Sequence, residues 1–360
     1  MSCEGGATKL SELLEVAGDS GPDNAHGTSS QLRQGGERAH LVAGHALFVR
    51  VHLDTDFAGD TDDAAALVML LGRPDAELVG ITTTADPDGV RAGYVRYVLG
   101  LAGRDDIPVA TGAGASLGGT AMGDLPSHGA YWGDAVVAPA PSPQGAATAL
   151  LGSSVDAGAT VIGIGPYTNL AHLEANRPGI LAETRVVLMG GWVTPPADGL
   201  PQWEPEMDWN VQCDVTAALI VFEAALDLTL VTLPATLRAH LQVAHLARLE
   251  GSGPIGRLLA RQARAHGAEH QMADVGRAHS GVPDDLLNFQ YDPVACAVGL
   301  GWSGAAITSM DLQPKLERDA LGFVAVDDGK PVDVDVVVDV DGVEFANLWL
   351  TAVEHADRRR

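Results

Sequence analysis

The feature that most constrains this chain is the segment 47–71, in which five aspartates separate two apolar stretches. Its first part, LFVRVHL, is largely apolar with two β-branched valines and is typical of a buried strand. Its last part, residues 64–71, is apolar on every side, which favours a helix buried against a sheet. The turn between them holds Asp54, Asp56, Asp60, Asp62 and Asp63. Crowded carboxylates with apolar flanks repel one another, so this turn requires a cation or a ligand.

The all-carboxylate donor set of this turn favours Ca²⁺ or Mg²⁺ over zinc. A calcium loop between two helices does not fit, because Ala58 and Ala65 stand where that loop needs ligands and a strand precedes the turn. An aspartyl-phosphate phosphatase has a similar Asp-x-Asp turn, but none of the lysines, Lys9, Lys315 and Lys330, is well placed to serve it. An acidic loop in solvent is disfavoured by the apolar flanks.

Composition excludes several classes of protein. The chain has 360 residues and a formal net charge of -25, which disfavours nucleic acid as a partner. Its three cysteines are far apart and form no CxxC pair, so neither a disulfide framework nor a zinc site is indicated. Residues 1–39 lack the apolar core of a signal peptide, and no run of 18 apolar residues predicts a membrane span. We therefore expect a cytoplasmic protein that does not bind membranes.

Strand and helix patterns alternate along the chain, which predicts an α/β fold with a mostly parallel sheet and helices on both faces. Strands are expected after the acidic turn at 77–84, 107–110, 160–165, 184–189, 228–233, 322–326 and 332–340. Helices are expected at 90–101, 215–225, 238–270 with a break at 251–253, 293–298 and 343–355. Residues 112–144 and 192–209 form two long loops, which are usually functional. Residues 1–42 are expected to be a flexible tail and 43–360 a single α/β domain.

Four motifs, in the same order along the chain, resemble those of the nucleoside hydrolase family. Asp-Thr-Asp at 54–56 with Asp-Asp-Ala at 62–64 resembles the two ends of the family's D-x-D-x-G-x-D-D-A signature, with two more residues between them. Gly-Pro-Tyr-Thr-Asn-Leu-Ala at 165–171 resembles its G-P-L-T-N-L-A motif. Met-Gly-Gly at 189–191, followed by Asp-Trp-Asn at 208–210, resembles its M-G-G and E-F-N segments. Tyr-Asp-Pro-Val-Ala at 291–295 resembles H-D-P-x-A.

The resemblance implies a calcium site in a Rossmann-like nucleoside hydrolase fold. The metal ligands that it implies are Asp56, Asp60, Asp63, Asp292 and the backbone carbonyl of Thr168. Calcium takes ~6–8 oxygen ligands, so positions remain for a water and for the cis-diol of ribose.

The resemblance also implies hydrolysis of the N-glycosidic bond of a small ribonucleoside, with Asp56 taking a proton from a calcium-bound water. Asp62, Asp208 and Asn210 are expected to bind ribose hydroxyls, with Glu206 compensating for the short Asp208 side chain. Trp203 and Trp209 are candidates for stacking on the base. A homodimer or homotetramer is expected.

Three residues are candidates for protonating the leaving base: Asp86, His128 and Tyr291. Tyr291 stands where one branch of the family has a histidine. Asp86 and the loop tryptophans favour purine bases. A metal-dependent phosphatase and a non-catalytic binder of nucleosides or ribose remain alternatives.

Overall fold

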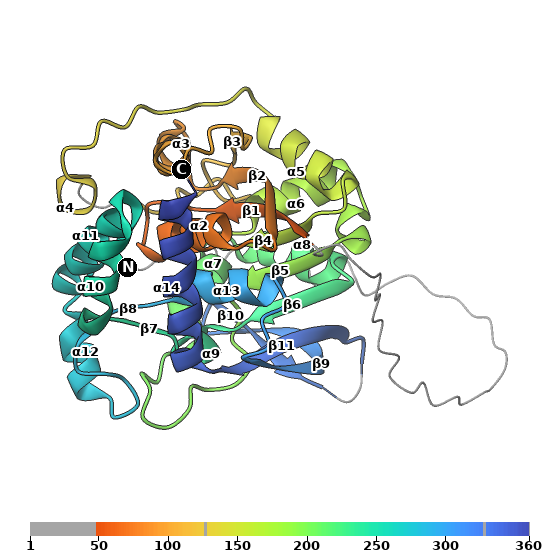
Figure 1. Ribbon diagram of the computed structural model, residues 1–360. Helices are drawn as coiled ribbons and strands as arrows, with labels where there is room; N and C mark the ends of the chain where they lie inside the picture. The colour runs from red at the N-terminus through yellow and green to blue at the C-terminus, as the bar shows by residue number, and fades with distance from the viewer. Residues whose placement is uncertain (1–47, 126–127, 327–328, 360) are drawn as a thin grey trace, which may run out of the picture.

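A nine-stranded sheet forms the centre of the described part of the protein (Figure 1). The computed structural model describes residues 48–125, 128–326 and 329–359. The sheet order is β10 (Ala320–Ala325), β9 (Ala305–Glu317), β11 (Val332–Val340), β6 (Asp227–Val231), β5 (Arg185–Met189), β4 (Thr160–Gly163), β1 (Val49–Thr55), β2 (Ala76–Thr83) and β3 (Val109–Thr111). Neighbouring strands from β11 to β3 are parallel, whereas β9 is antiparallel to both β10 and β11. The predicted α/β fold with a mostly parallel sheet is confirmed.

Helices pack on both faces of the sheet, which explains why the central strands are apolar at consecutive positions. One face is covered by α2 (Asp62–Gly72), α3 (Val90–Leu101) and α13 (Tyr291–Gly299), and α14 (Gly342–Arg358) packs on α2. The other is covered by α5 (Ala146–Asp156), α6 (Thr168–Asn176) and α8 (Val215–Ala224). Beside α14 lie α10 (Leu246–Ser252) and α11 (Pro254–Glu269), with α12 (Met272–Ala278) next to α11 (Figure 1).

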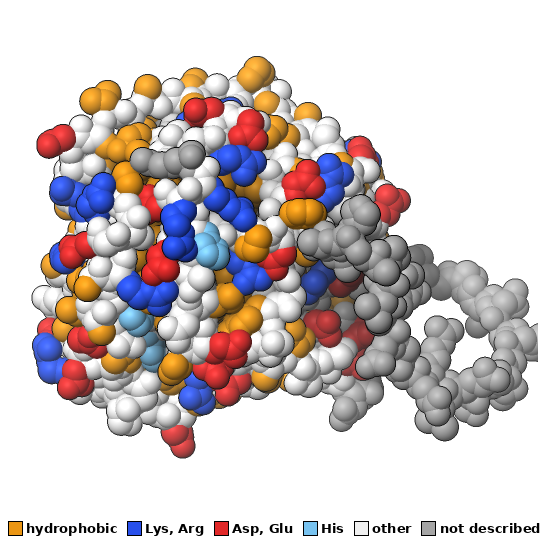
Figure 2. Space-filling view, viewed as in Figure 1, with side chains coloured by type: hydrophobic (Ala, Val, Ile, Leu, Met, Phe, Trp, Pro, Cys, Tyr) orange, Lys and Arg blue, Asp and Glu red, His pale blue; other side chains and the backbone are white. Residues whose placement is uncertain are grey.

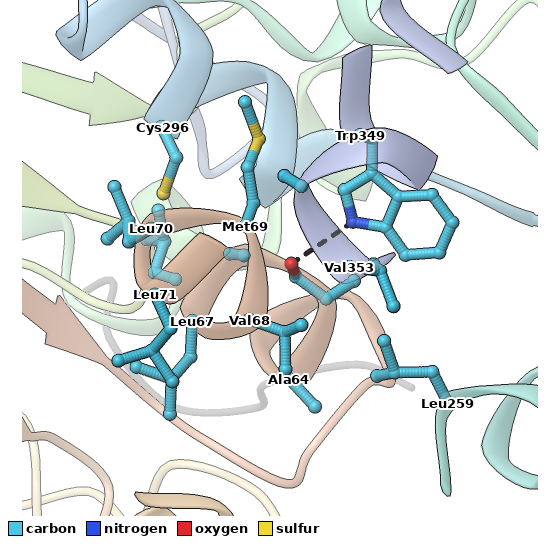
Figure 3. Packing of buried hydrophobic residues seen from close by; sticks show 14 of the residues in the cluster. Ala64, Leu67, Val68, Met69, Leu70, Leu71, Leu259, Cys296, Trp349 and Val353 are labelled. Atoms are coloured by element: carbon cyan, nitrogen blue, oxygen red, sulfur yellow. Dashed lines mark hydrogen bonds between the residues drawn. The ribbon is translucent and has the colours of Figure 1, made fainter. Parts of the chain in front are cut away.

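Helix α2 is buried along its whole length, as the uniformly apolar sequence of residues 64–71 predicts for that part of it. Figure 3 shows its side chains beside Cys296 of α13 and Trp349 of α14. The Trp349 indole N–H donates to the carbonyl oxygen of Ala65 at 3.1 Å. A Cβ atom added at Gly72 would lie 1.8 Å from the carbonyl oxygen of Ala352, so only glycine lets α14 approach this closely. These contacts hold α2 against α14 near both of its ends, at Ala65 and at Gly72.

The structure differs from the sequence predictions in several elements. Helices α5 and α12 and strands β8 (Leu286–Phe289) and β9 were not predicted, and the short helix α4 (His128–Trp132) lies in a segment that was expected to be a loop. Strand β7 (His240–Gln242), which pairs with β8, lies in a segment expected to be helical. Strand β9 was missed because most of its side chains are exposed, so it lacks the apolar alternation of a half-buried strand.

The remaining short elements connect the larger ones: α7 (Trp209–Cys213), α9 (Leu233–Thr236) and the 3₁₀ helices η1 (Ile180–Glu183), η2 (Pro205–Met207) and η3 (Val243–His245). The predicted flexible tail, residues 1–42, lies outside the described residues. Within the described ranges, no helix combines the length and apolar character needed to cross a membrane. Acidic and basic side chains are interspersed over the face shown in Figure 2.

Candidate active site

The predicted motifs converge at the carboxyl ends of the central parallel strands. The acidic turn follows β1, Ile164 and Gly165 follow β4, and Gly190 and Gly191 follow β5. The N-terminal ends of α2 and α13 reach the same edge, where the main-chain N–H of Asp292 donates to the Asp62 carboxylate at 3.2 Å. In open α/β sheets this edge is where ligands bind.

Three carboxylates form the centre of this site. Asp62, Asp63 and Asp292 are all buried, and each offers an oxygen within 4.8 Å of those of the other two. Burial, together with the repulsion among these neighbouring carboxylates, raises the pKa of each of the three well above its usual value. A cation bound by the three oxygens would offset both the cost of burying the charged carboxylates and the repulsion among them. The donor set therefore fits a hard divalent metal such as Ca²⁺ or Mg²⁺.

Asp54 and Asp56 extend the cluster toward the sheet. The Asp54 Oδ1 accepts hydrogen bonds from Thr82 and from Asn169, the latter at 2.8 Å. Its Oδ2 is buried and has no hydrogen-bond partner among the described residues. Burial raises the pKa of Asp54 to about 7, although the two hydrogen bonds oppose this. The Asp56 carboxylate accepts a hydrogen bond from the Trp209 indole N–H at 3.1 Å, and its pKa is also raised by burial.

The longer turn is fixed by residues that are distant in the sequence. The buried Arg91 guanidinium donates to the carbonyl oxygens of Asp56 and Phe57. The Phe57 side chain is fully buried beside Trp132, with the ring centroids 6.2 Å apart. Ala58 has a positive φ of 71°, which lets the chain reverse direction at this point. The longer turn is therefore held in place by the buried Phe57 side chain within it and by the buried Arg91 guanidinium, which bonds its main chain.

Asp60 is turned toward a different set of partners from those of the three-carboxylate cluster. Its Oδ2 lies 3.3 Å from His266 Nε2 of α11, and its Oδ1 accepts from Asn288 Nδ2 at 2.8 Å. Burial alone would lower the pKa of His266, but the Asp60 carboxylate outweighs it and raises this pKa above the usual value. The His266 charge and the hydrogen bonds hold the pKa of Asp60 well below its usual range, against the effect of burial. Because both of its oxygens already have partners, Asp60 is a weaker candidate for a metal ligand than Asp63.

Thr168, the predicted carbonyl ligand, is the first residue of α6, so its carbonyl oxygen faces the next turn of that helix. Its hydroxyl donates to Asp214 at 2.8 Å. The structure therefore gives no support to this residue as a carbonyl ligand. The main-chain oxygen of Ile164 lies at the end of β4 and accepts from Asn210 Nδ2 at 3.2 Å. Ile164 directly precedes Gly165, and a Cβ atom added at Gly165 would lie 2.9 Å from Asp56 Oδ1.

The predicted ribose-binding residues occupy two different environments. Asp208 is buried, and its oxygens accept from the main-chain N–H groups of Gly191 at 2.6 Å and of Val211 at 3.3 Å. Asn210 Nδ2 also donates to the carbonyl oxygen of Met189 at 3.0 Å. Both residues therefore lie at the end of β5, next to the cluster. Glu206, by contrast, is exposed and lies 4.0 Å from Arg318, so the structure does not bring it into the site.

The three candidates for the proton donor also occupy different environments. The Asp86 carboxylate accepts bonds from the Thr83 hydroxyl and from the N–H groups of Arg91 and Ala92, so its hydrogen bonds are made within its own turn. His128 bonds the Tyr94 hydroxyl at 2.7 Å and the Ala135 carbonyl at 2.8 Å, which occupies both ring nitrogens. Tyr291 directly precedes Asp292 of the three-carboxylate cluster.

Burial and the nearby carboxylates of Asp60, Asp62 and Asp292 raise the pKa of Tyr291 well above its usual value of 10. The phenol therefore keeps its proton at neutral pH.

The two tryptophans that are candidates for stacking also occupy different environments. Trp203 packs edge-on against Phe289, with the ring centroids 5.6 Å apart, whereas Trp209 donates a hydrogen bond to Asp56.

Sequence reasoning missed four polar residues that hold the site together: Arg91, Asn169, His266 and Asn288. Asn169 was visible as part of the Gly-Pro-Tyr-Thr-Asn motif, and it joins β1, β2 and the loop at Ala113 through three hydrogen bonds. Arg91 and His266 lie in helices and carry no local signal, because their partners in the acidic turn are remote in sequence.

Comparison with known proteins identifies a family and relatives for this chain. The model of the inosine-uridine preferring nucleoside hydrolase family matches residues 51–347. The pyrimidine-specific ribonucleoside hydrolase RihA of Shewanella sp. (strain ANA-3) is 30% identical over 310 residues, which cover 81% of this chain and 92% of that protein.

Two solved structures share the fold. A plant nucleoside hydrolase superposes with a TM-score of 0.71 at 21% identity, covering 85% of this chain and 98% of that one. The purine-preferring ribonucleoside hydrolase from Gardnerella vaginalis also gives 0.71, at 22% identity, covering 86% and 100%. The carboxylate cluster, the motif order and these matches lead to one conclusion: this chain belongs to the inosine-uridine preferring nucleoside hydrolase family.

Proposed function

We propose that this protein hydrolyses the N-glycosidic bond of ribonucleosides to free base and ribose, and that it uses Ca²⁺. The observation that carries the proposal is the buried set of Asp62, Asp63 and Asp292, with oxygens within 4.8 Å of one another. Family membership supports the reaction class, and the all-oxygen donor set supports a hard divalent cation. Asp56 is the fourth carboxylate that we assign to this metal, because it lies at the end of β1 beside the same turn.

Calcium held by these carboxylates would supply Lewis acidity, which would lower the pKa of a water molecule. Asp56 is the base that we assign to this water, since burial raises the pKa of its carboxylate and makes it a better proton acceptor. The water oxygen forms the new bond to the anomeric carbon as the bond to the base nitrogen breaks. Buried carboxylates around the sugar stabilise the positive charge that develops on the ring.

Binding of the ribose is assigned to Asp62, Asp208 and Asn210. The side chains of Asp208 and Asn210 are fixed by hydrogen bonds to main-chain groups at the ends of β4 and β5, so they are held in position before substrate binds. A hydrogen-bonded carboxylate oxygen retains further acceptor capacity, and this leaves Asp208 able to accept from a sugar hydroxyl.

Protonation of the leaving base is assigned to Tyr291. The other two candidates, Asp86 and His128, already use their polar atoms in bonds within the fold. Tyr291 keeps its proton at neutral pH and lies beside the aspartates of the turn. The family's histidine is thus replaced by a weaker acid that remains protonated.

The purine preference expected from the sequence loses one of its two supports, because Asp86 is used within its own turn. Among the relatives, RihA is named pyrimidine-specific and the Gardnerella protein purine-preferring. Location in the cytoplasm and assembly as a homodimer or homotetramer stay predictions.

Release of free base from a panel of nucleosides tests the proposal. Inosine, adenosine, guanosine, uridine and cytidine are incubated with the full-length protein after EDTA treatment, and again after Ca²⁺ is restored. We expect base release that depends on Ca²⁺, and the panel also gives the base preference.

Two outcomes would replace the proposal. Hydrolysis of a phosphomonoester that needs Mg²⁺ and not Ca²⁺ would indicate a phosphatase. The structure does not favour this outcome, because Lys315, one of the lysines such a phosphatase could use, lies at the surface, paired with Glu317 at 2.6 Å. Calorimetric binding of ribonucleosides without base release would indicate a non-catalytic binder.

A further inference from the structure

The Trp209 indole is in hydrogen-bond contact with the acidic turn. Its N–H donates to Asp56 Oδ2 at 3.1 Å. Trp209 is the first residue of α7, and the preceding Asp208 bonds the N–H groups of Gly191 and Val211. The backbone that carries the indole is therefore fixed to the end of β5.

The long loop after β3 packs against the edge of the indole next to its N–H group. Gly123 has a φ of 73°, and a Cβ added there would lie 2.6 Å from Cζ2 of Trp209. Trp209 also packs against a small apolar cluster of Ala85, Met122 and Cys213. The indole is thus held in contact with both this loop and the Asp56 carboxylate.

This hydrogen bond decides which oxygen of Asp56 is open to a ligand. A carboxylate that binds calcium can use one oxygen or both. The indole N–H takes up part of the acceptor capacity of Oδ2, so Oδ1, which lies toward Gly165, is the oxygen better placed to bind the metal. Metal-binding carboxylates are commonly oriented by such hydrogen bonds from neighbouring groups, and the loss of one weakens metal binding by ~10–100-fold.

We propose that Trp209 is a positioning residue for the metal site: its indole N–H orients Asp56 so that this carboxylate binds the cation through Oδ1 alone. The inference rests on the proposed function, which assigns Asp56 to the metal. It gives Trp209 a role that the stacking prediction did not include, because it acts before any nucleoside binds.

The test is calcium affinity, measured by calorimetry on the full-length protein without nucleoside. Trp209→Phe keeps a ring at the position and removes only the N–H donor. We expect its Kd for Ca²⁺ to rise ~10–100-fold. Trp192→Phe is the matched control, because Trp192 also donates its indole N–H, to the Trp203 carbonyl at 3.1 Å, without contacting the aspartates. We expect its calcium affinity to be unchanged.

A second pair of variants tests the same contact from the loop side. Gly123→Ala adds a methyl group against the indole and should also weaken calcium binding. Gly119→Ala is its control, since Gly119 has a similar φ of 80° but nothing within 4 Å of an added Cβ. Both alanines carry the same backbone strain, so a difference in calcium affinity reports the displaced indole.

The outcomes separate this inference from the proposed function. If the wild-type protein binds no Ca²⁺, the proposed function fails first. If it binds Ca²⁺ and Trp209→Phe binds it equally well, the positioning role is wrong. Tighter binding by Trp209→Phe would also overturn it, since the N–H would then compete with the metal for Oδ2. A change in KM that depends on the base, with unchanged calcium affinity, would assign Trp209 to stacking instead.

Discussion

Replacing Asp54 by asparagine tests whether buried carboxylates destabilise the metal-free protein at neutral pH. Asp54 is fully buried, and its Oδ1 serves as the acceptor for Thr82 and Asn169. Asparagine has nearly the same shape and keeps an acceptor for both donors, but it carries no charge. The substitution therefore removes the cost of burying the ionised group without removing these two bonds.

The magnitude follows from the pKa of Asp54, which rises from 3.8 to about 7 on folding. The native state then binds more protons than the unfolded state between these two values, so the free energy of unfolding falls as pH rises across this window. The fall is ~1.4 kcal/mol per pH unit, or on the order of 4 kcal/mol in total. Asp208, whose pKa rises to about 6, acts in the same direction in both proteins.

Urea unfolding at pH 5, 6, 7 and 8, with EDTA present, measures this dependence. We expect the wild-type protein to lose stability from pH 5 to 7 more steeply than Asp54→Asn. Saturating Ca²⁺ should flatten the wild-type curve, because a nearby cation favours the ionised carboxylate. Identical pH dependence in the two metal-free proteins, or a wild-type stability that increases with pH, would refute the reasoning.

Three further substitutions test the assigned roles. Asp56→Asn should keep the fold, measured by circular dichroism, and lower kcat by at least ~10³-fold; near-normal turnover would remove Asp56 as the base. Gly165→Ala should weaken calcium binding and cost ~1–3 kcal/mol in a thermal melt, because the added Cβ would lie 2.6 Å from Asp56 N and 2.9 Å from its Oδ1. Gly251→Ala, with nothing within 4 Å of its Cβ, should leave calcium binding unchanged, and equal effects of the two would contradict the packing argument. Tyr291→Phe should lower kcat ~10²-fold in steady-state assays, with little change in KM, and an unchanged kcat would exclude the phenol as proton donor.

The sheet and the cluster at its edge were predictable because their signals are local. The apolar run before Asp54 and the uniformly apolar residues 64–71 each indicate a buried element, and the aspartates between them indicate a ligand site. The assignment of Asp292 to the same site needed the motif order, which the resemblance supplied.

The remaining features depend on contacts between remote segments. Nothing near Arg91 or His266 in the sequence shows that these side chains are buried against the turn, because each meets its partner only after the sheet and α11 have formed. Asp86 differs, because its three hydrogen bonds are to groups within six residues of it in the sequence, yet the turn that brings them together is visible only in the structure. Local patterns predict elements and candidate residues, whereas the partners of a polar side chain are set by the tertiary fold.

The most direct measurement of the central claim compares ribonucleosides with their 2′-deoxy forms in the presence of Ca²⁺. If the ribose 2′- and 3′-hydroxyls complete the coordination of the cation beside Asp62, Asp63 and Asp292, removing one leaves both the cation and its hydrogen-bonding residues without a partner. Loss of such a hydroxyl costs ~10⁴-fold in specificity. We therefore predict kcat/KM for base release to be ~10⁴-fold lower for the deoxy substrates. Equal values for the two sugars would contradict the account.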